Sequence, residues 1–251
     1  MDTVQIEQKG AVTWVWLNRS ERLNALNEQV ITTLCEVFAA FRENTTTRVI
    51  VLAGRGGTFC AGFDIEWMAS RTPEMVRQDR ADLRAFYELI ESCPQPVICA
   101  VQGNAMGGGL ILTMVSDFVV AADTARFGAP EIKIGIFPSL HLIPRLERLV
   151  GLRAAKSIVL TGDPVDAQTA LQIGLISQVT SLERLYEVVQ ALAEQLAMSP
   201  SHASKAIKEA FSTHLLPNFS DWETNTAVEC WSQPARQELM QAFLNKRRSR
   251  L

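Results

Sequence analysis

The sequence is poor in the residues that hold metals or covalent cross-links. Its five cysteines are scattered, odd in number and never spaced C-x-x-C, which argues against a disulfide framework and a structural zinc site. The three histidines, His141, His202 and His214, show no metal-ligand spacing. We therefore predict a chain without a metal site that works in a reducing, cytoplasmic setting.

Long apolar runs and an excess of charge of either sign are also missing. No run reaches the length of a membrane span, and the first residues lack the basic and apolar regions of a signal peptide. The formal net charge of −3 gives no electrostatic reason to expect binding to nucleic acid or to an anionic membrane. What remains is 251 residues, 47% hydrophobic and 20% charged, which is typical of one large globular domain or of one with a small appendage.

Strand and helix patterns alternate along most of the chain. Helices are expected to begin near Asn27 and at Pro73, and the second is expected to end before Pro94. The strands are expected at residues 4–8 and 12–17, which form a hairpin, and at 49–53, 96–101, 118–121 and near 179. A glycine-rich loop, of the sort that carries function, fills residues 54–65. This alternation predicts parallel strands with right-handed crossovers.

From Leu182 onward the pattern is helical, with segments that begin near residues 200, 220 and 234. A helical part of roughly 55 residues is too small to bury a core alone, so we expect it to pack on a partner surface. The sequence thus predicts an α/β core over residues 1–195 and a helical oligomerisation region over residues 196–251.

Three consecutive glycines at positions 107–109 separate a buried strand from an apolar helix. Each would destabilise a helix interior by roughly 1 kcal/mol relative to alanine. Three together therefore indicate backbone angles that other residues rarely adopt, or a ligand or chain segment that comes close to the backbone. The N–H groups at a helix start favour negative charge, but the pattern is neither G-x-G-x-x-G nor a P-loop. The alternative is a tightly packed turn that binds nothing.

Several stretches, in a fixed order, resemble the crotonase superfamily of enoyl-CoA hydratases and isomerases. They are Asn24-Ala25-Leu26, residues 59–64, residues 103–109, Pro130-Glu131 and residues 242–247. The resemblance runs nearly end to end and implies a spiral core of ββα units with helices at the end that form a trimer or a dimer of trimers. It also implies an acyl thioester of coenzyme A, or of acyl-carrier protein, as the substrate, and no cofactor besides the coenzyme A of that substrate.

The resemblance implies a role for two peptide groups. The N–H groups of Phe63 and Gly108 would form an oxyanion hole for the thioester carbonyl, and such donors suit the negative charge of an enolate. Asp64 is expected to hold the loop by hydrogen bonds rather than to take protons. The substrate's coenzyme A is expected to contact Arg22, Ala25, Ala61 and Ile65, with Phe243 and Lys246 reaching it from the last helix. A solvated basic tail is the alternative for residues 246–248.

Hydratases of this family use two glutamates, and this chain keeps one of them. Glu131 stands in the Pro-Glu pair, whereas Ile111 occupies the place three residues after the oxyanion glycine. Because residues i and i+3 share a helix face, Ile111 is expected to face the same site as Gly108. One base is enough to carry a proton between two carbons, so we expect an enoyl-CoA isomerase that moves a double bond from delta3 to delta2.

Two alternatives remain open at this point. Ser139 and His141, eight and ten residues after Glu131, offer a second polar group, which keeps a hydratase, a dehydratase or a decarboxylase in consideration. A crotonase-like binding or scaffold protein without turnover is the alternative of another class. Retention of Glu131 and of both oxyanion positions argues against the inactive alternative.

Overall fold

The computed structural model describes residues 2–213, 222 and 224–228. The chain divides into two compact units, Met1–Ala197 and Met198–Leu251. The division lies two residues from the boundary expected at residue 195. The second unit begins with α8 (Ser201–Thr213), which starts where the sequence predicts a helix, and residues 222 and 224–228 are also helical. Its role in oligomerisation stays a prediction.

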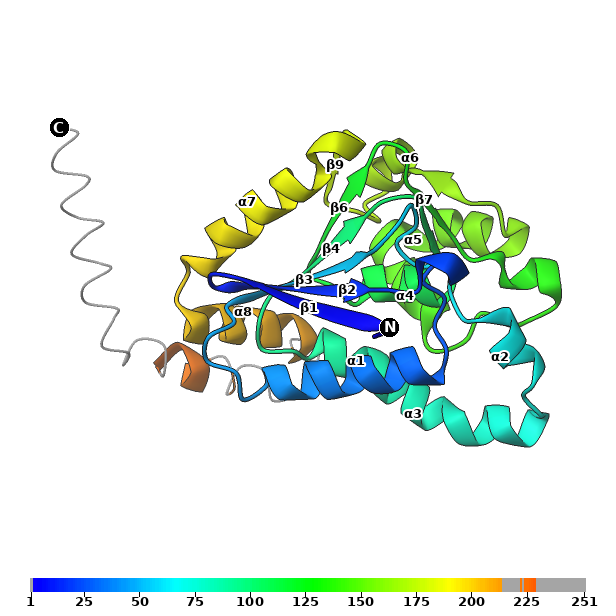
Figure 1. Ribbon diagram of the computed structural model, residues 1–251, viewed down its shortest axis with the longest axis horizontal. Helices are drawn as coiled ribbons and strands as arrows, with labels where there is room; N and C mark the ends of the chain where they lie inside the picture. Colours follow the sequence, from blue (N-terminus) through cyan, green and yellow to red (C-terminus); the bar gives the residue numbers. More distant parts are fainter. Residues whose placement is uncertain (1, 214–221, 223, 229–251) are drawn as a thin grey trace, which may run out of the picture. The chain divides into compact units, whose positions relative to one another are not determined.

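A six-stranded sheet runs through the first unit (Figure 1). Its strands, in spatial order, are β1 (Val4–Lys9), β2 (Val12–Leu17), β3 (Val49–Gly54), β4 (Val97–Val101), β6 (Phe118–Ala122) and β9 (Gln178–Thr180). The hairpin of β1 and β2 is antiparallel, and every later neighbour pairs in parallel. The parallel sheet predicted from the alternation is therefore confirmed.

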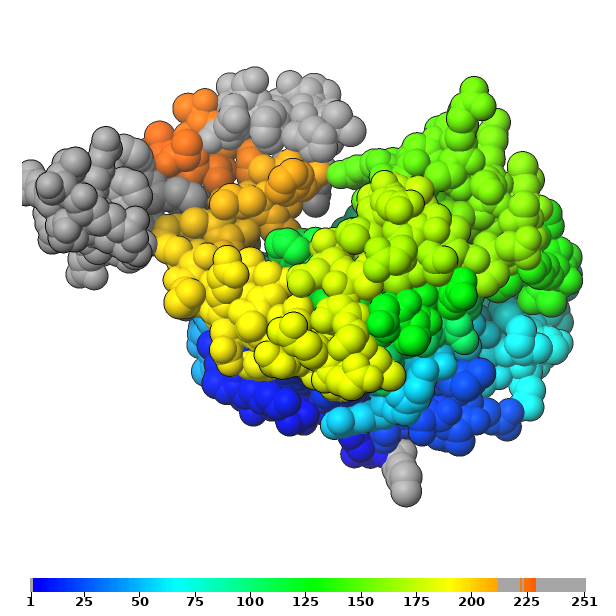
Figure 2. All heavy atoms as spheres, turned by 90° about the horizontal axis from the view of Figure 1, so that it is seen from above, coloured from blue at the N-terminus to red at the C-terminus, as the bar shows by residue number. Residues whose placement is uncertain are grey.

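The two faces of this sheet pack against different helices, which is why its central strands are apolar throughout. One face carries Leu52 and Cys99 into the larger core, with α1 (Glu28–Phe41) and α3 (Pro73–Glu91). The other face packs against α7 (Leu185–Ala197), where Tyr186 meets the ring of Trp14 edge-on at 5.7 Å. Figure 2 shows the residues of α7, in yellow, on the surface of this side.

A second, smaller sheet turns the chain into a spiral. It consists of β5 (Asn104–Met106), β7 (Arg126–Gly128) and β8 (Val165–Asp166). Each turn of the chain gives one strand to the large sheet, one to the small sheet and then a helix: β4, β5 and α4 (Gly108–Met114), followed by β6, β7 and α5 (Leu142–Thr161). These are the ββα units that the family resemblance implies.

The helix starts follow local signals in the sequence. The side chain of Asn27 accepts a hydrogen bond from the N–H of Val30 at 3.0 Å and begins α1, and Pro73 occupies the first turn of α3. A short helix, α2 (Ile65–Ala69), follows the predicted glycine-rich loop and was not expected from the sequence. The remaining α6 (Ala167–Gln172) precedes β9. No helix among the residues that the structure describes is long and apolar enough to cross a membrane.

Candidate active site

Three segments of the chain reach one place because they leave neighbouring strands at their carboxyl ends. Cys60 forms a parallel bridge with Ala105 of β5, and Met106 of β5 pairs in parallel with Gly128 of β7. Three residues beyond Cys60, Ala105 and Gly128 stand Phe63, Gly108 and Glu131, respectively. Ligands of open α/β folds bind outside the carboxyl ends of the strands, and the same topology brings these three residues together here.

The N–H group of Phe63 is left free by the way its loop is held. In the bridge between Phe63 and Leu26, the N–H of Leu26 donates to Gly62 at 2.8 Å and the N–H of Asp64 donates to Leu26 at 2.9 Å. These two hydrogen bonds use the carbonyl of Gly62 and the N–H of Asp64. The N–H of Phe63 lies between them and points away from Leu26. No acceptor for it is found in the described part of the chain.

The N–H group of Gly108 is free because it opens α4, where the first turn of a helix lacks intrahelical acceptors. The two donors are neighbours: a Cβ built on Gly62 would lie 3.5 Å from the Gly108 nitrogen, and one built on Gly108 would lie 3.0 Å from the Phe63 ring. The loop with Cys60 and Phe63 can lie this close to the start of α4 because that helix begins with glycines, which have no side chain. A Cβ on Gly109 would come within 2.3 Å of the Cys60 carbonyl oxygen.

The carboxyl group of Glu131 faces the same place from a 3₁₀ turn, Pro130–Ile134. Its Oε1 lies 2.8 Å from where a Cβ on Gly107 would stand, and its Oε2 is buried with no hydrogen-bond partner among the described residues. Burial raises the pKa of Glu131 above its usual value, because the charged form is poorly solvated. A buried carboxyl with an unused oxygen and a raised pKa is typical of a general base.

These groups line one cavity of about 110 Å³, which we call the thioester cavity. Ile111, only 2% exposed, lines it one turn of α4 beyond Gly108, as the helix spacing predicts. Three more residues predicted from the sequence, Ala61, Ile65 and Ser139, also line it. The rest of the wall is largely apolar and includes Met68, Pro130, Ile134, Ile136, Phe137 and Leu140.

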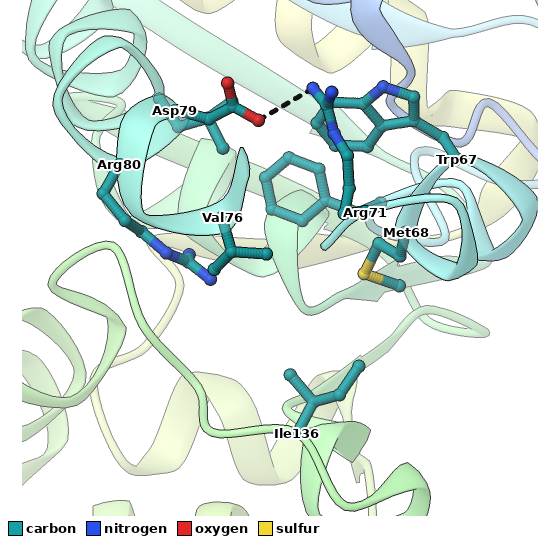
Figure 3. Close-up of a pocket in the computed structure, with 9 residues that line it drawn as sticks. Trp67, Met68, Arg71, Val76, Asp79, Arg80 and Ile136 are labelled. Atoms are coloured by element: carbon teal, nitrogen blue, oxygen red, sulfur yellow. Dashed lines mark ion pairs between the residues drawn. The ribbon is translucent and has the colours of Figure 1, made fainter. Parts of the chain in front are cut away.

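A second cavity of about 200 Å³, the side cavity, adjoins the first (Figure 3). The two share the lining residues Phe63, Met68, Arg80 and Ile136. The side cavity extends between α2 and α3, where Trp67 and Val76 add apolar walls. The Phe63 ring stands between the two spaces and stacks on Trp67 with the ring centroids 5.9 Å apart.

Two residues of α3 contribute to the site without any local motif. The buried hydroxyl of Tyr87 donates a hydrogen bond to the Gly108 carbonyl at 3.1 Å and so holds the peptide that begins α4. The guanidinium of Arg80 donates to the Ser139 hydroxyl inside the thioester cavity. Their helix precedes the three glycines by many residues in sequence. Only the apolar pattern of its inner face indicated that the helix packs against the core.

Other predicted residues lie away from the cavity. Arg22 is exposed and forms an ion pair with Glu66 at 3.0 Å, and Ala25 is buried behind the loop. His141 is exposed at the start of α5 and does not line either cavity described above. Phe243 and Lys246 lie outside the described residues.

The loop before α2 is held as expected for Asp64. Its carboxylate caps α2 by accepting from the N–H of Glu66 at 3.0 Å and pairs with Arg19 at 3.1 Å. Burial works against the charged form of Asp64, but the hydrogen bonds from Arg19 and from the backbone keep its pKa below the usual value. Asn24 also holds this loop, because its side-chain amide donates a hydrogen bond to the Thr58 carbonyl at 2.7 Å. Both side chains position the Phe63 loop.

Comparisons with known proteins agree with this architecture. Residues 7–250 match the family model described as enoyl-CoA hydratase/isomerase. A probable enoyl-CoA hydratase of Rhizobium meliloti is 35% identical, over 99% of this chain and 97% of that protein. A crotonyl-CoA hydratase of Syntrophomonas wolfei is 31% identical, over 99% of this chain and 97% of its own length. A crystal structure of an enoyl-CoA hydratase from Bacillus anthracis superposes with a TM-score of 0.92, at 32% identity, covering 97% of this chain and 96% of that one.

The spiral of ββα units defines a crotonase-type fold. The chain belongs to the enoyl-CoA hydratase/isomerase family. Members of this family act on acyl-CoA thioesters.

Proposed function

We propose that this chain is an enoyl-CoA isomerase that moves a double bond from the delta3 to the delta2 position. One observation carries the proposal: Glu131 is the only carboxylate among the described residues that line the thioester cavity. Isomerisation needs one base that serves two carbons in turn. Hydration normally needs one group to activate water and another to deliver a proton.

In the proposed reaction, the thioester carbonyl accepts hydrogen bonds from the N–H groups of Phe63 and Gly108. These donors stabilise the enolate oxygen, because they are fixed before charge develops on it. Glu131 takes a proton from C2, and the protonated carboxyl returns that proton to C4 on the same face. The double bond then lies between C2 and C3, conjugated with the carbonyl, and the enzyme is unchanged. No cofactor is needed besides the coenzyme A of the substrate.

The surroundings of Glu131 support this role. Its raised pKa makes the carboxyl a stronger base and lets it keep the abstracted proton long enough to return it. Ile111 closes the wall of the cavity where a second glutamate would stand, and its side chain can neither hold water nor carry a proton.

Hydration of a 2-enoyl thioester, or the reverse dehydration, is the second candidate. The relatives compared above are named as hydratases, and the Ser139 hydroxyl lies in the thioester cavity with Arg80 as its donor. A serine held in this way offers a water molecule one hydrogen-bond partner beside Glu131. It provides no acid of its own at neutral pH, which is why we rank hydration second.

A paired assay with 3-enoyl-CoA and 2-enoyl-CoA substrates tests the proposal. We expect faster turnover of the 3-enoyl thioester, and a loss of about 10²–10⁴-fold in Glu131→Gln, which removes the base and keeps the shape. Glu36→Gln, an exposed glutamate on α1, serves as the matched control and should retain full activity.

Hydration of the 2-enoyl substrate that outpaces isomerisation would favour the second candidate. A folded wild-type protein that binds coenzyme A thioesters and turns over neither substrate would favour the scaffold alternative. Either result contradicts the isomerase proposal.

A further inference from the structure

Arg80 is the one cation among the described residues that lines both cavities, and it has no carboxylate partner in that part of the chain. Arg71, the other arginine of the side cavity, pairs with Asp79 at 2.8 Å and lies over the Trp67 ring at 4.4 Å. In Figure 3, Asp79 points towards Arg71, whereas Arg80 projects from α3 on the side that faces Ile136. The Asp79 carboxylate therefore forms its ion pair with Arg71 and acts on Arg80 only through its charge, without an ion-pair contact.

A half-buried guanidinium without an ion-pair partner destabilises the folded protein. Burial and the charge of Arg84 lower the pKa of Arg80, and the charge of Asp79 opposes this shift without reversing it. Its hydrogen-bond partner is the neutral hydroxyl of Ser139, which balances no charge. Buried cations are normally paired with an anion, and a cation left unpaired next to a binding cavity points to an anionic group of the ligand.

We propose that Arg80 determines specificity by binding a carboxylate at the far end of the acyl group, so that the substrate is the coenzyme A thioester of an unsaturated dicarboxylic acid. The inference rests on the proposed function in one respect, that an acyl thioester occupies the thioester cavity. It does not depend on which proton transfer Glu131 performs.

The geometry suits this assignment. An acyl chain whose carbonyl is held by Phe63 and Gly108 meets Arg80 at the boundary with the side cavity. A guanidinium has five N–H donors, and Ser139 accepts from one nitrogen of Arg80, Nη1, which leaves donors for a two-point contact with a carboxylate. Val76, Leu83 and Ile136 line the side cavity with apolar atoms, which help to exclude water and strengthen that contact. The Asp79 carboxylate also lines this cavity, but its charge is balanced by the ion pair with Arg71.

Binding of saturated acyl-CoA probes tests the proposal apart from catalysis. We suggest calorimetric titration of the full-length protein with succinyl-, glutaryl- and adipoyl-CoA, each against the neutral thioester of equal length: butyryl-, pentanoyl- and hexanoyl-CoA. In at least one pair, the wild-type protein should bind the carboxylated probe about tenfold to hundredfold more tightly. In Arg80→Gln this preference should disappear, while binding of the neutral probes is kept or improved.

Two further variants make the result specific. Arg77→Gln removes an exposed arginine of the same helix and should keep the preference, which controls for general attraction of the polyanionic probes. Arg80→Lys keeps the charge without the planar fork and should keep part of the preference even if Arg80→Gln folds poorly. The inference is refuted if no pair shows a preference, or if the preference survives in folded Arg80→Gln. A failed isomerase assay with intact discrimination among the probes would refute the proposed reaction and leave this inference standing.

Discussion

Replacing Ile111 with glutamate tests the link between the number of carboxylates and the reaction. Ile111 lies in the first turn of α4, 2% exposed, and its side chain lines the thioester cavity together with Glu131. The substitution places a second carboxyl on the wall of the cavity without changing the backbone donors at Phe63 and Gly108. It supplies the proton donor that hydration needs.

The variant should be less stable and should still fold. Losing a buried isoleucine side chain and burying part of a carboxyl destabilises the protein by about 2–4 kcal/mol. For a chain of this size that corresponds to a fall in Tm of roughly 5–15 °C. The new carboxyl should also have a raised pKa, since it is buried and close to the charge of Glu131. A raised pKa keeps it partly protonated at neutral pH, which suits a proton donor.

The assay is hydration of crotonyl-CoA, followed by the loss of absorbance of the conjugated double bond. We expect Ile111→Glu to hydrate about 10- to 100-fold faster than the wild-type protein. This gain is at or below the lower end of the range for general acid–base catalysis, because the surrounding residues are not arranged for hydration. Ile111→Gln is the matched control: it is polar and of similar size but cannot donate a carboxyl proton, so it should bring no gain.

The reasoning would be wrong if the folded Ile111→Glu variant hydrated no faster than Ile111→Gln. It would also be wrong if the wild-type protein already hydrated crotonyl-CoA rapidly. In that case another polar group, with Ser139 the first to examine by Ser139→Ala, would take the place of the missing glutamate.

Three further predictions follow from the same features. Because burial raises the pKa of Glu131, kcat/KM for a 3-enoyl-CoA should fall as the pH decreases through an apparent pKa above that of an ordinary exposed glutamate. An apparent pKa at or below the ordinary value would contradict the assignment of Glu131 as the base. Gly107→Ala forces a side chain onto a residue with φ +50° and within 2.8 Å of Glu131 Oε1, so Tm should drop by several degrees and kcat should fall more than KM rises. Light scattering should give three or six times the 27.8 kDa mass of the chain, and a monomer at micromolar concentration would refute the role given to residues 196–251.

Much of the fold could be predicted because its signals are local. Four strands of the large sheet, β2, β3, β4 and β6, are apolar runs bounded by turns. Asn27 and Pro73 mark helix starts, and the spacing of Gly108 and Ile111 places both on one face of a helix. The small sheet was harder, because β5 and β7 have three residues each and β8 has two, too few to show a period. Their pairing depends on contacts between turns of the spiral.

The parts of the site that were not predicted come from distant segments. Tyr87 and Arg80 lie on α3, and nothing near them in sequence indicates that one holds the Gly108 peptide and the other the Ser139 hydroxyl. Conversely, His141 is close to Glu131 in sequence, yet it lies at the start of α5 with an exposed side chain and lines neither cavity. Distance along the chain is a weak guide to a site assembled from three strand ends.

The two peptide N–H groups that we propose as oxyanion donors, those of Phe63 and Gly108, respond to mutation differently from the side chains of the site. Both belong to peptide groups, and almost every amino acid brings the same N–H group to its position, proline being the exception. At position 63 the proposed donor is therefore kept under most substitutions, whereas any side chain at Gly108 would come within 2.9 Å of the Tyr87 hydroxyl and 3.0 Å of the Phe63 ring. Ile111, Ser139 and Arg80, by contrast, act through their side chains. Point mutations at these positions can change the reaction or the acyl group that is bound, while the backbone donors still bind the thioester carbonyl. New activities could therefore evolve on this fold through few mutations.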